Sequence, residues 1–264
     1  AAIATRTEVE ERQVDEVVKD VRNDKKLVQY VRKNMDFIGE KYIERDLTQG
    51  IGSTDVGNVT HEIPAIQFYV KLKEHVGTHT KEFAVAAGGE EGKRNADIMA
   101  EKLKKYGWNY VVVDIQWYEP GAESAAYRKF ADLKIDEYSR VLPAENRFPS
   151  SADGVGFAPL AEYVHQLGLK FGIHILRGIP RQAVHGRMHI KGTDKTADQI
   201  AINSICPWNS DMYGVDMSIP EGQLYYDSLM ELYASWGVDF IKVDDIAYST
   251  IYRDSHRKEI EGIR

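Results

Sequence analysis

Two short apolar stretches of the sequence each end in an aspartate. One runs from Asp239 to Asp245 (DFIKVDD), and the other runs from Tyr110 to Trp117 (YVVVDIQW), with Asp114 directly after its apolar residues. Apolar runs this short are typical of buried strands in a parallel sheet. Active sites of parallel α/β barrels lie at the carboxyl ends of the strands. The pattern therefore predicts an enzyme whose carboxylates converge at one edge of a sheet.

The composition is that of an ordinary globular protein and argues against several partner classes. The 264 residues are 43% hydrophobic and 28% charged, with a formal net charge of −7. A nucleic-acid partner is not expected, because phosphate binding needs clustered Lys and Arg. No apolar run approaches the roughly 18 residues of a membrane helix, and no signal peptide is visible at the N-terminus. We expect a soluble protein without a membrane partner, and its compartment is not predicted.

Cysteine and histidine content limits the metal chemistry. The single cysteine, Cys206, excludes an intramolecular disulfide and a zinc site with several thiolates from this chain. Eight histidines leave a site of His and carboxylate ligands open.

A repeated order of helix, glycine and strand is expected to position the two acidic strand ends. Three predicted helices each end at a glycine that precedes a predicted strand: 95–106 before 110–113, 157–167 before 170–175, and 222–236 before 239–243. Long irregular stretches, 118–156 and 177–220, follow the first two strands. This alternation predicts an α/β fold containing part of a (β/α)8 (TIM-type) barrel. A doubly wound open sheet is the alternative, although no glycine-rich phosphate loop follows any of the strands.

The first ninety or so residues follow a different pattern. Helices are predicted over 7–22 and 24–43, the second with Asn23 as its N-cap, and a strand over 66–72. The change near Gly92 predicts a boundary between an α+β segment of residues 1–92 and a barrel-like segment of residues 93–264.

Residues from about 93 onward resemble family 27 glycoside hydrolases, the α-galactosidase (melibiase) group, and particularly its bacterial members. The matching segments are Tyr110–Trp117, Gly168–His174 and Phe240–Asp244. The last is the most specific, because in that family the Asp of a Lys-x-Asp strand is the catalytic nucleophile. The resemblance implies retaining hydrolysis of terminal α-galactosides in an oligosaccharide or glycoside, without a metal or organic cofactor.

The resemblance also gives roles to individual residues. Asp244 would attack the anomeric carbon, while Lys242 on the same strand face would bind the sugar and keep Asp244 ionised. Asp114 matches the acid that holds galactose hydroxyls. The remaining residues expected to contact the sugar are Trp117 against the ring, His174 where the family usually has an aromatic, and Cys206 and Trp208 in one loop. For Trp117, a place in the core is an equal alternative.

The sequence departs from the family pattern at three points. Ile115 stands where the family often has a second acid, and the opening Gly-Trp-Asn-Ser-Trp segment is absent. A retaining glycosidase needs a second carboxyl about 5–5.5 Å from the nucleophile, as acid and then base. In the family it lies on a later strand, so we expect it to be missing before Arg264 and hydrolysis to be impaired. Asp245 should point to the opposite strand face and serve as a loop acid or N-cap.

Residues 1–92 resemble the C-terminal part of zinc amidohydrolases of the aminoacylase and aminobenzoyl-glutamate hydrolase type. The segments that carry the resemblance are 52–64, 77–83 and 86–88. The resemblance implies that His79 is a zinc ligand, with the other ligands in an earlier part of the enzyme. Because zinc catalysis uses three protein ligands, His79 alone does not make a site. The simplest interpretation is a fusion of two incomplete enzymes near Gly92.

Three functions therefore stand as hypotheses. The first is an α-galactosidase-type glycoside hydrolase that uses Asp244. The second is a fragment of a zinc amidohydrolase, and the third is a sugar-binding remnant without catalysis. An open half barrel would expose strand edges and apolar surface, which predicts self-association into a homo-oligomer.

Overall fold

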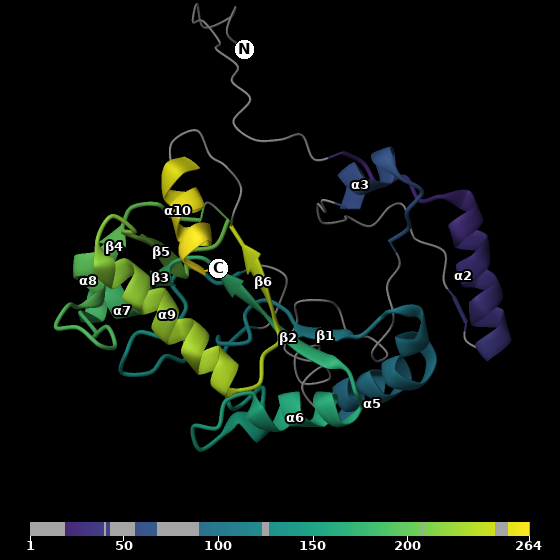
Figure 1. Cartoon of the computed structure of the whole chain (residues 1–264), viewed down its shortest axis with the longest axis horizontal. Coiled ribbons are helices and arrows are strands. Elements are labelled where there is room, and N and C mark those ends of the chain that lie inside the picture. Colours follow the sequence, from purple (N-terminus) through teal and green to yellow (C-terminus); the bar gives the residue numbers. More distant parts are fainter. Residues whose placement is uncertain are drawn as a thin grey trace, which may run out of the picture. The chain divides into compact units, whose positions relative to one another are not determined.

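The computed structural model describes residues 19–39, 41–42, 56–67, 90–122, 127–206, 208–245 and 253–263. The chain divides into two compact units, residues 1–71 and 72–264, so the boundary in the sequence precedes the change of pattern near Gly92. Figure 1 labels the helices and strands of both units. The predicted helix over 7–22 lies largely outside the described residues, and so does His79. No helix in the described ranges is both long and apolar enough to cross a membrane.

The first unit contains helices α2 (Lys25–Ile38) and α3 (Val56–Glu62). Helix α2 begins after Asp24, whose carboxylate accepts two backbone N–H groups of the first turn at 2.9 Å each. It ends at Gly39, which has a φ of 74°. The N-cap is therefore Asp24, one residue after the predicted Asn23, and the helix is shorter than the predicted 24–43.

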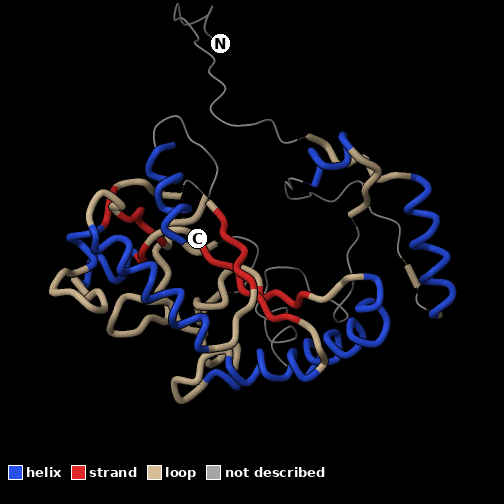
Figure 2. The backbone as a smooth tube through the Cα atoms, in the orientation of Figure 1, coloured by secondary structure: helices blue, strands red, loops and turns tan. Residues whose placement is uncertain are grey.

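A three-stranded parallel sheet organises the second unit. Strand β2 (Lys170–Leu176) lies between β1 (Tyr110–Val113) and β6 (Phe240–Asp244), as Figure 1 and the tube in Figure 2 show. Helix α6 (Ala158–Gln166) leads into β2, and helix α9 (Pro220–Ser235) leads into β6. The three predicted strands and these two predicted helices are confirmed to within two residues. The unit has the expected order of helix, short turn and strand.

A continuous helical stretch leads into β1. It starts with α5 (Glu90–Ile98) and continues through the π-helical turn η1 (Met99–Leu103) and the 3₁₀ turn η2 (Lys104–Tyr106). Gly107 ends it with a φ of 93°, a conformation that glycine adopts without steric cost. The prediction of a helix over 95–106 is confirmed, although helical structure begins five residues earlier and runs through Gly92.

The stretch predicted as irregular, 177–220, contains a second small sheet. Its strands β3 (Ile179–Pro180), β5 (Met212–Val215) and β4 (Ala201–Ile202) pair antiparallel in that order. Sequence periodicity missed these elements because each has only two to six residues. The elements in this stretch are β3 (Ile179–Pro180), α7 (Arg181–Gly186), α8 (Ala197–Ile200), β4 (Ala201–Ile202) and β5 (Met212–Val215); η3 (Pro149–Ser151) and α10 (Arg253–Ile263) are two further elements of this unit.

The core of the second unit is built around Trp117, which is completely buried. Its ring makes edge-on contacts with Tyr118 and Phe157, each at 5.3 Å between ring centres, and with Trp236 at 6.3 Å. Its indole N–H donates to the backbone oxygen of His174 at 2.6 Å. The sequence left two positions open for Trp117, against a sugar ring or in the core. The structure places it in the core, since no face of its ring is open to solvent.

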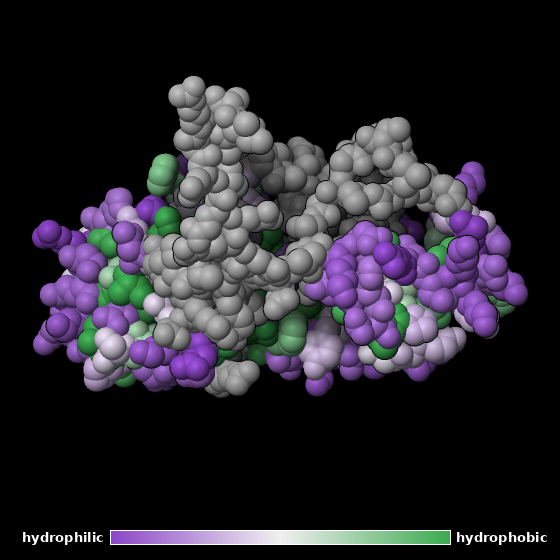
Figure 3. Space-filling view, turned by 90° about the horizontal axis from the view of Figure 1, so that it is seen from above, coloured by the Kyte–Doolittle hydropathy of each residue, from purple (hydrophilic) through white to green (hydrophobic). Residues whose placement is uncertain are grey.

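The opposite face of the sheet is more exposed. Tyr110, Val112 and Phe240 are each 37–45% exposed, and the rings of Tyr110 and Phe240 contact each other edge-on at 5.4 Å. In the view of Figure 3, hydrophilic residues make up most of the described surface, with hydrophobic residues in small groups among them. The exposed face carries side chains from alternate positions of β1 and β6, which include the acidic strand ends.

Replacing Trp117 with alanine tests its place in the core. We expect Trp117→Ala to lower the free energy of unfolding by about 3–5 kcal/mol, because it leaves a large cavity among aromatic rings. Trp108→Ala is the matched control, since Trp108 is 57% exposed, and it should change stability by about 0.5 kcal/mol or less. Urea unfolding measures both. Equal stability of the two variants would show that Trp117 is not a core residue.

Candidate functional site

Strand register brings four of the predicted site residues onto one face of the parallel sheet. His174 pairs with Lys242 across β2 and β6, and two residues further on Leu176 pairs with Asp244. Val113 of β1 pairs with Ile173, so Asp114 follows at the level of His174. Because successive side chains of a strand point to opposite faces, this register places Asp114, His174, Lys242 and Asp244 on the same face.

The four side chains form two polar pairs. The ammonium of Lys242 donates to Asp114 Oδ1 at 3.1 Å, and both side chains are about half exposed. The fully buried ring of His174 places Nε2 3.4 Å from Asp244 Oδ2, while the Asp244 side chain is 45% exposed. The arrangement presents a carboxylate and an ion pair to solvent above a buried imidazole.

The surroundings of both carboxylates favour their ionised forms. The hydrogen bond to His174 lowers the pKa of Asp244 against the effect of burial, and the Asp245 N–H and the Lys242 ammonium lower it further. Burial alone would raise the pKa of Asp114, but the charges of Lys242 and His174 hold that pKa below its usual range. Asp244 therefore has the charge state that a nucleophile requires.

Asp245 belongs to a buried ionic cluster behind the site. Its carboxylate pairs with Arg177 at 2.8 Å, and Arg177 also donates to Glu259 of α10 at 2.9 Å. Tyr226 of α9 donates its hydroxyl to the second oxygen of Glu259 at 2.7 Å. Asp245 directly follows β6 and is a buried, paired acid. The residues that it was expected to cap lie outside the described part of the chain.

Cys206 and Trp208 differ in their suitability for substrate contact. Cys206 is buried, and burial together with the Asp245 carboxylate raises the pKa of its thiol to about 12, so the thiol stays protonated. Trp208 is 43% exposed, and its ring lies 5.4 Å from that of Tyr127. Of these two residues, only Trp208 has an exposed side chain that a ligand can contact.

Two polar residues near the site were not predicted from the sequence. Burial raises the pKa of Tyr127, and so do the negative charges of Asp114 and Asp244. Asp211 is buried and accepts hydrogen bonds from Gln116 at 2.9 Å and from the Tyr118 hydroxyl at 3.3 Å. No periodicity marks either residue, because both lie in irregular segments.

The described part of the chain contains no group of three or more His, Cys, Asp or Glu side chains that could hold a metal ion. His79, the predicted zinc ligand, lies outside that part. The zinc hypothesis therefore stays a prediction without a described site.

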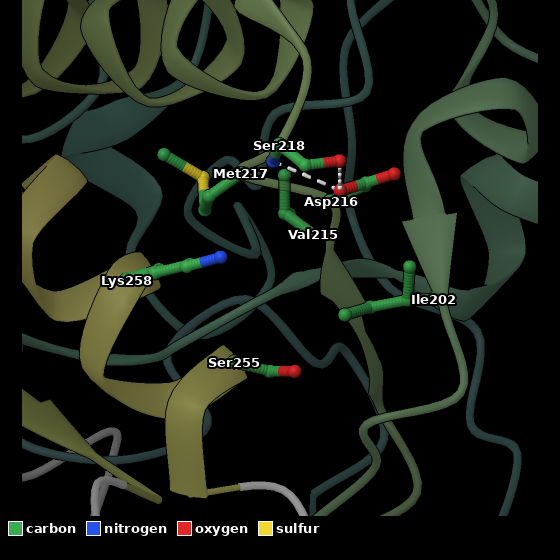
Figure 4. A pocket seen from close by; sticks show the side chains of 7 residues that line it. All are labelled: Ile202, Val215, Asp216, Met217, Ser218, Ser255 and Lys258. Carbon is green, nitrogen blue, oxygen red and sulfur yellow. Dashed lines mark hydrogen bonds between the residues drawn. The ribbon is translucent and has the colours of Figure 1, made fainter.

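A small pocket of about 90 Å³ lies elsewhere in this unit, between the end of β5 and α10 (Figure 4). Ser255 and Lys258 of α10 line it opposite Asp216 and Ser218. The Asp216 carboxylate accepts hydrogen bonds from the N–H and the hydroxyl of Ser218 at 2.9 and 2.6 Å. These groups already form the turn before α9, and none of the predicted site residues lines the pocket.

No family model matches the chain. Alpha-galactosidase 3 of Hypocrea jecorina is 28% identical over 145 residues, which are 54% of this chain and 19% of that protein. A variant of the family 27 β-L-arabinopyranosidase (Abp) of Geobacillus stearothermophilus, solved with arabinose, is 59% identical with a TM-score of 0.65. That alignment covers 71% of this chain and 42% of the other. The wild-type enzyme is also 59% identical, with a TM-score of 0.64, and its alignment covers 70% of this chain and 41% of that chain.

The similarities are thus to an α-galactosidase and to glycoside hydrolases of family 27. The chain spans less than half the length of these relatives. None of the comparisons supports the amidohydrolase resemblance of residues 1–92.

Glu259 predicts a specific pH dependence of stability. Burial raises its pKa to about 7, against the lowering effects of Arg177 and Tyr226, from an ordinary value of 4.5. Between these values the folded state holds a proton that the unfolded state has released. The free energy of unfolding should therefore fall as pH rises from 4.5 to 7, by about 1.4 kcal/mol for each pH unit.

Glu259→Gln should lack this component, so its stability relative to the wild type should increase across the same window. Glu261→Gln is the matched control, because Glu261 lies on the same helix with a 61% exposed side chain. Urea unfolding at pH 4.5, 5.5 and 7 measures the three proteins. Parallel pH profiles for all three would contradict the assignment.

Proposed function

We propose that this chain carries the sugar site of a retaining glycoside hydrolase of the α-galactosidase type, with Asp244 as the nucleophile. The observation that carries the proposal is the shared sheet face of Asp114, His174, Lys242 and Asp244 at the carboxyl ends of parallel strands. We also propose that this sheet is part of a (β/α)8 barrel, because parallel barrels carry their active sites at this edge.

Asp244 would perform the first displacement. One of its carboxylate oxygens forms a bond to the anomeric carbon while the bond from that carbon to the aglycone oxygen breaks. The aglycone leaves with the bonding electrons and takes up a proton, and water then hydrolyses the glycosyl ester. The lowered pKa of Asp244 and its 45% exposed side chain support this role.

Lys242 and Asp114 would bind the sugar hydroxyls. Their ion pair is about half exposed, so a hydroxyl can donate to the Asp114 carboxylate and accept from the Lys242 ammonium. Trp208, whose ring lies beside that of Tyr127, would offer an aromatic ring to the sugar. Trp117 is not included, because it lies in the core.

The general acid is not assigned to a described residue. Asp245 is paired with Arg177, and Asp211 is held by Gln116 and Tyr118. Aryl glycosides with acidic leaving groups need less protonation and are the substrates of choice for a test.

The proposed substrates are terminal glycosides of galactose configuration. α-D-Galactopyranosides and β-L-arabinopyranosides have the same ring configuration and differ only in the hydroxymethyl group at C5. The solved relative is a β-L-arabinopyranosidase, and the curated relative is an α-galactosidase. Both sugar classes belong in the assay.

The two alternative functions make different predictions. A non-catalytic sugar-binding remnant would raise its melting temperature with galactose or arabinose but show no turnover. A zinc amidohydrolase fragment would require zinc and lose its metal in His79→Ala.

Asp244→Asn tests the proposal directly. On 2,4-dinitrophenyl α-galactoside and the matching β-L-arabinopyranoside, we expect kcat/KM to fall by about a thousandfold or more, because the nucleophile acts in the transition state. The matched control is Asp239→Asn, just before the other end of β6. Asp239 accepts the Phe171 N–H at 2.8 Å, and asparagine keeps an acceptor oxygen there.

The Asp239→Asn variant should keep wild-type activity within about twofold. Equal activity of wild type and Asp244→Asn on both substrates would show that Asp244 is not the nucleophile.

A further inference from the structure

Arg177 follows β2 directly and is 1% exposed. Its backbone N–H donates to the backbone oxygen of Asp244 at 3.3 Å. Its guanidinium reaches the next residue twice, with Nε 2.9 Å from the Asp245 backbone oxygen and a terminal nitrogen 2.8 Å from the Asp245 carboxylate. Arg177 therefore holds both residues at the end of β6.

The guanidinium is itself fixed from the other side. Its remaining terminal nitrogen donates to the backbone oxygen of Ser204 at 3.1 Å and to Glu259 at 2.9 Å. Arg177 thus links the carboxyl ends of β2 and β6 to α10. A planar guanidinium bound at several points has little freedom to move.

Asp245 has an unusual backbone conformation, which must be maintained by contacts with other residues. Its φ is 61°, in the left-handed region, which costs a residue with a β-carbon of order 1 kcal/mol or more. The two contacts from Arg177 oppose the relaxation of this turn, since they grip the carbonyl and the carboxylate of the same residue.

The turn directs a donor at the proposed nucleophile. The Asp245 N–H lies 3.1 Å from Asp244 Oδ1, while His174 lies 3.4 Å from Oδ2. Each carboxylate oxygen of Asp244 therefore has its own contact. A carboxylate with both oxygens in contact has a defined orientation, and attack on an anomeric carbon depends on such orientation.

We propose that Arg177 is a positioning residue, which holds Asp245 in its left-handed turn so that the Asp245 N–H orients the carboxylate of Asp244. This rests on the proposed function for the claim that Asp244 reacts with substrate. Arg177 itself is buried and contacts no substrate. The effect of its side chain on the reaction passes through Asp245.

Arg177→Lys keeps a cation but loses the planar pair of contacts to Asp245. We expect kcat on 2,4-dinitrophenyl α-galactoside or β-L-arabinopyranoside to fall by about ten- to a hundredfold, with KM changed by less than about threefold. The pKa of the Asp244 carboxyl, followed by ¹³C NMR titration, should rise because the Asp245 N–H no longer stabilises the anion. Arg140→Lys is the matched control, since Arg140 is 8% exposed and pairs with Asp136 away from the site.

A second pair of variants tests the turn without changing Arg177. Asparagine tolerates the left-handed region and keeps an acceptor oxygen, whereas alanine does neither. We expect kcat of Asp245→Asn to exceed that of Asp245→Ala by about tenfold or more. This comparison remains informative if Arg177→Lys does not fold.

The outcomes separate the two proposals. An unchanged Asp244 pKa and unchanged kcat in Arg177→Lys, or equal kcat in the two Asp245 variants, would overturn the positioning role. If the wild type shows no turnover, or if Asp244→Asn is as active as the wild type, the proposed function fails. The NMR titration then still decides whether Arg177 positions the Asp244 carboxylate.

Discussion

The parallel pairing of β2 with β6 is the constraint on which the candidate site depends. It sets His174 opposite Lys242 and Leu176 opposite Asp244, and the alternation of side chains places the polar residues on one face. A register shift by one residue would turn Lys242 and Asp244 toward the aromatic core. Gly172 lies under this face, where a β-carbon would stand 3.0–3.1 Å from Phe240. A side chain at this position would therefore crowd Phe240 where β2 and β6 lie side by side.

Two sets of buried contacts keep this register in place. On the core side, the indole of Trp117 donates to the backbone of β2 at His174, which ties the loop after β1 to the central strand. At the carboxyl end, Arg177 joins the ends of β2 and β6 through Asp245 and carries Glu259 of α10 on its other side. A buried ion cluster of this kind is a weak source of net stability, because desolvation offsets much of the attraction. Its contribution here is to the orientation of the strand ends.

The sequence predicted the parts of this structure that local pattern controls. The strand at 110–113, the helix before β2 and the acidic end of β6 follow from apolar runs and from glycines after helices. The resemblance to family 27 also brought together Asp114, His174, Lys242 and Asp244. Pattern could not predict the second sheet, whose strands have two to four residues. It also could not decide whether Trp117 lies in the core, which depends on the rings of Tyr118, Phe157, Tyr233 and Trp236. Arg177, Tyr127 and Asp211 were missed because their roles come from partners distant in sequence, such as Glu259, which is 82 residues from Arg177.

The most direct measurement of the central claim is covalent trapping of the nucleophile. A 5-fluoro-α-D-galactosyl fluoride, or its β-L-arabinopyranosyl counterpart, carries a leaving group that needs no protonation and forms a slowly hydrolysed glycosyl ester. Mass spectrometry of the intact protein and of its peptides should find one fluoroglycosyl group per chain, attached to Asp244 and absent from Asp244→Asn. No adduct with either reagent, or an adduct on another residue, would contradict the assignment of Asp244.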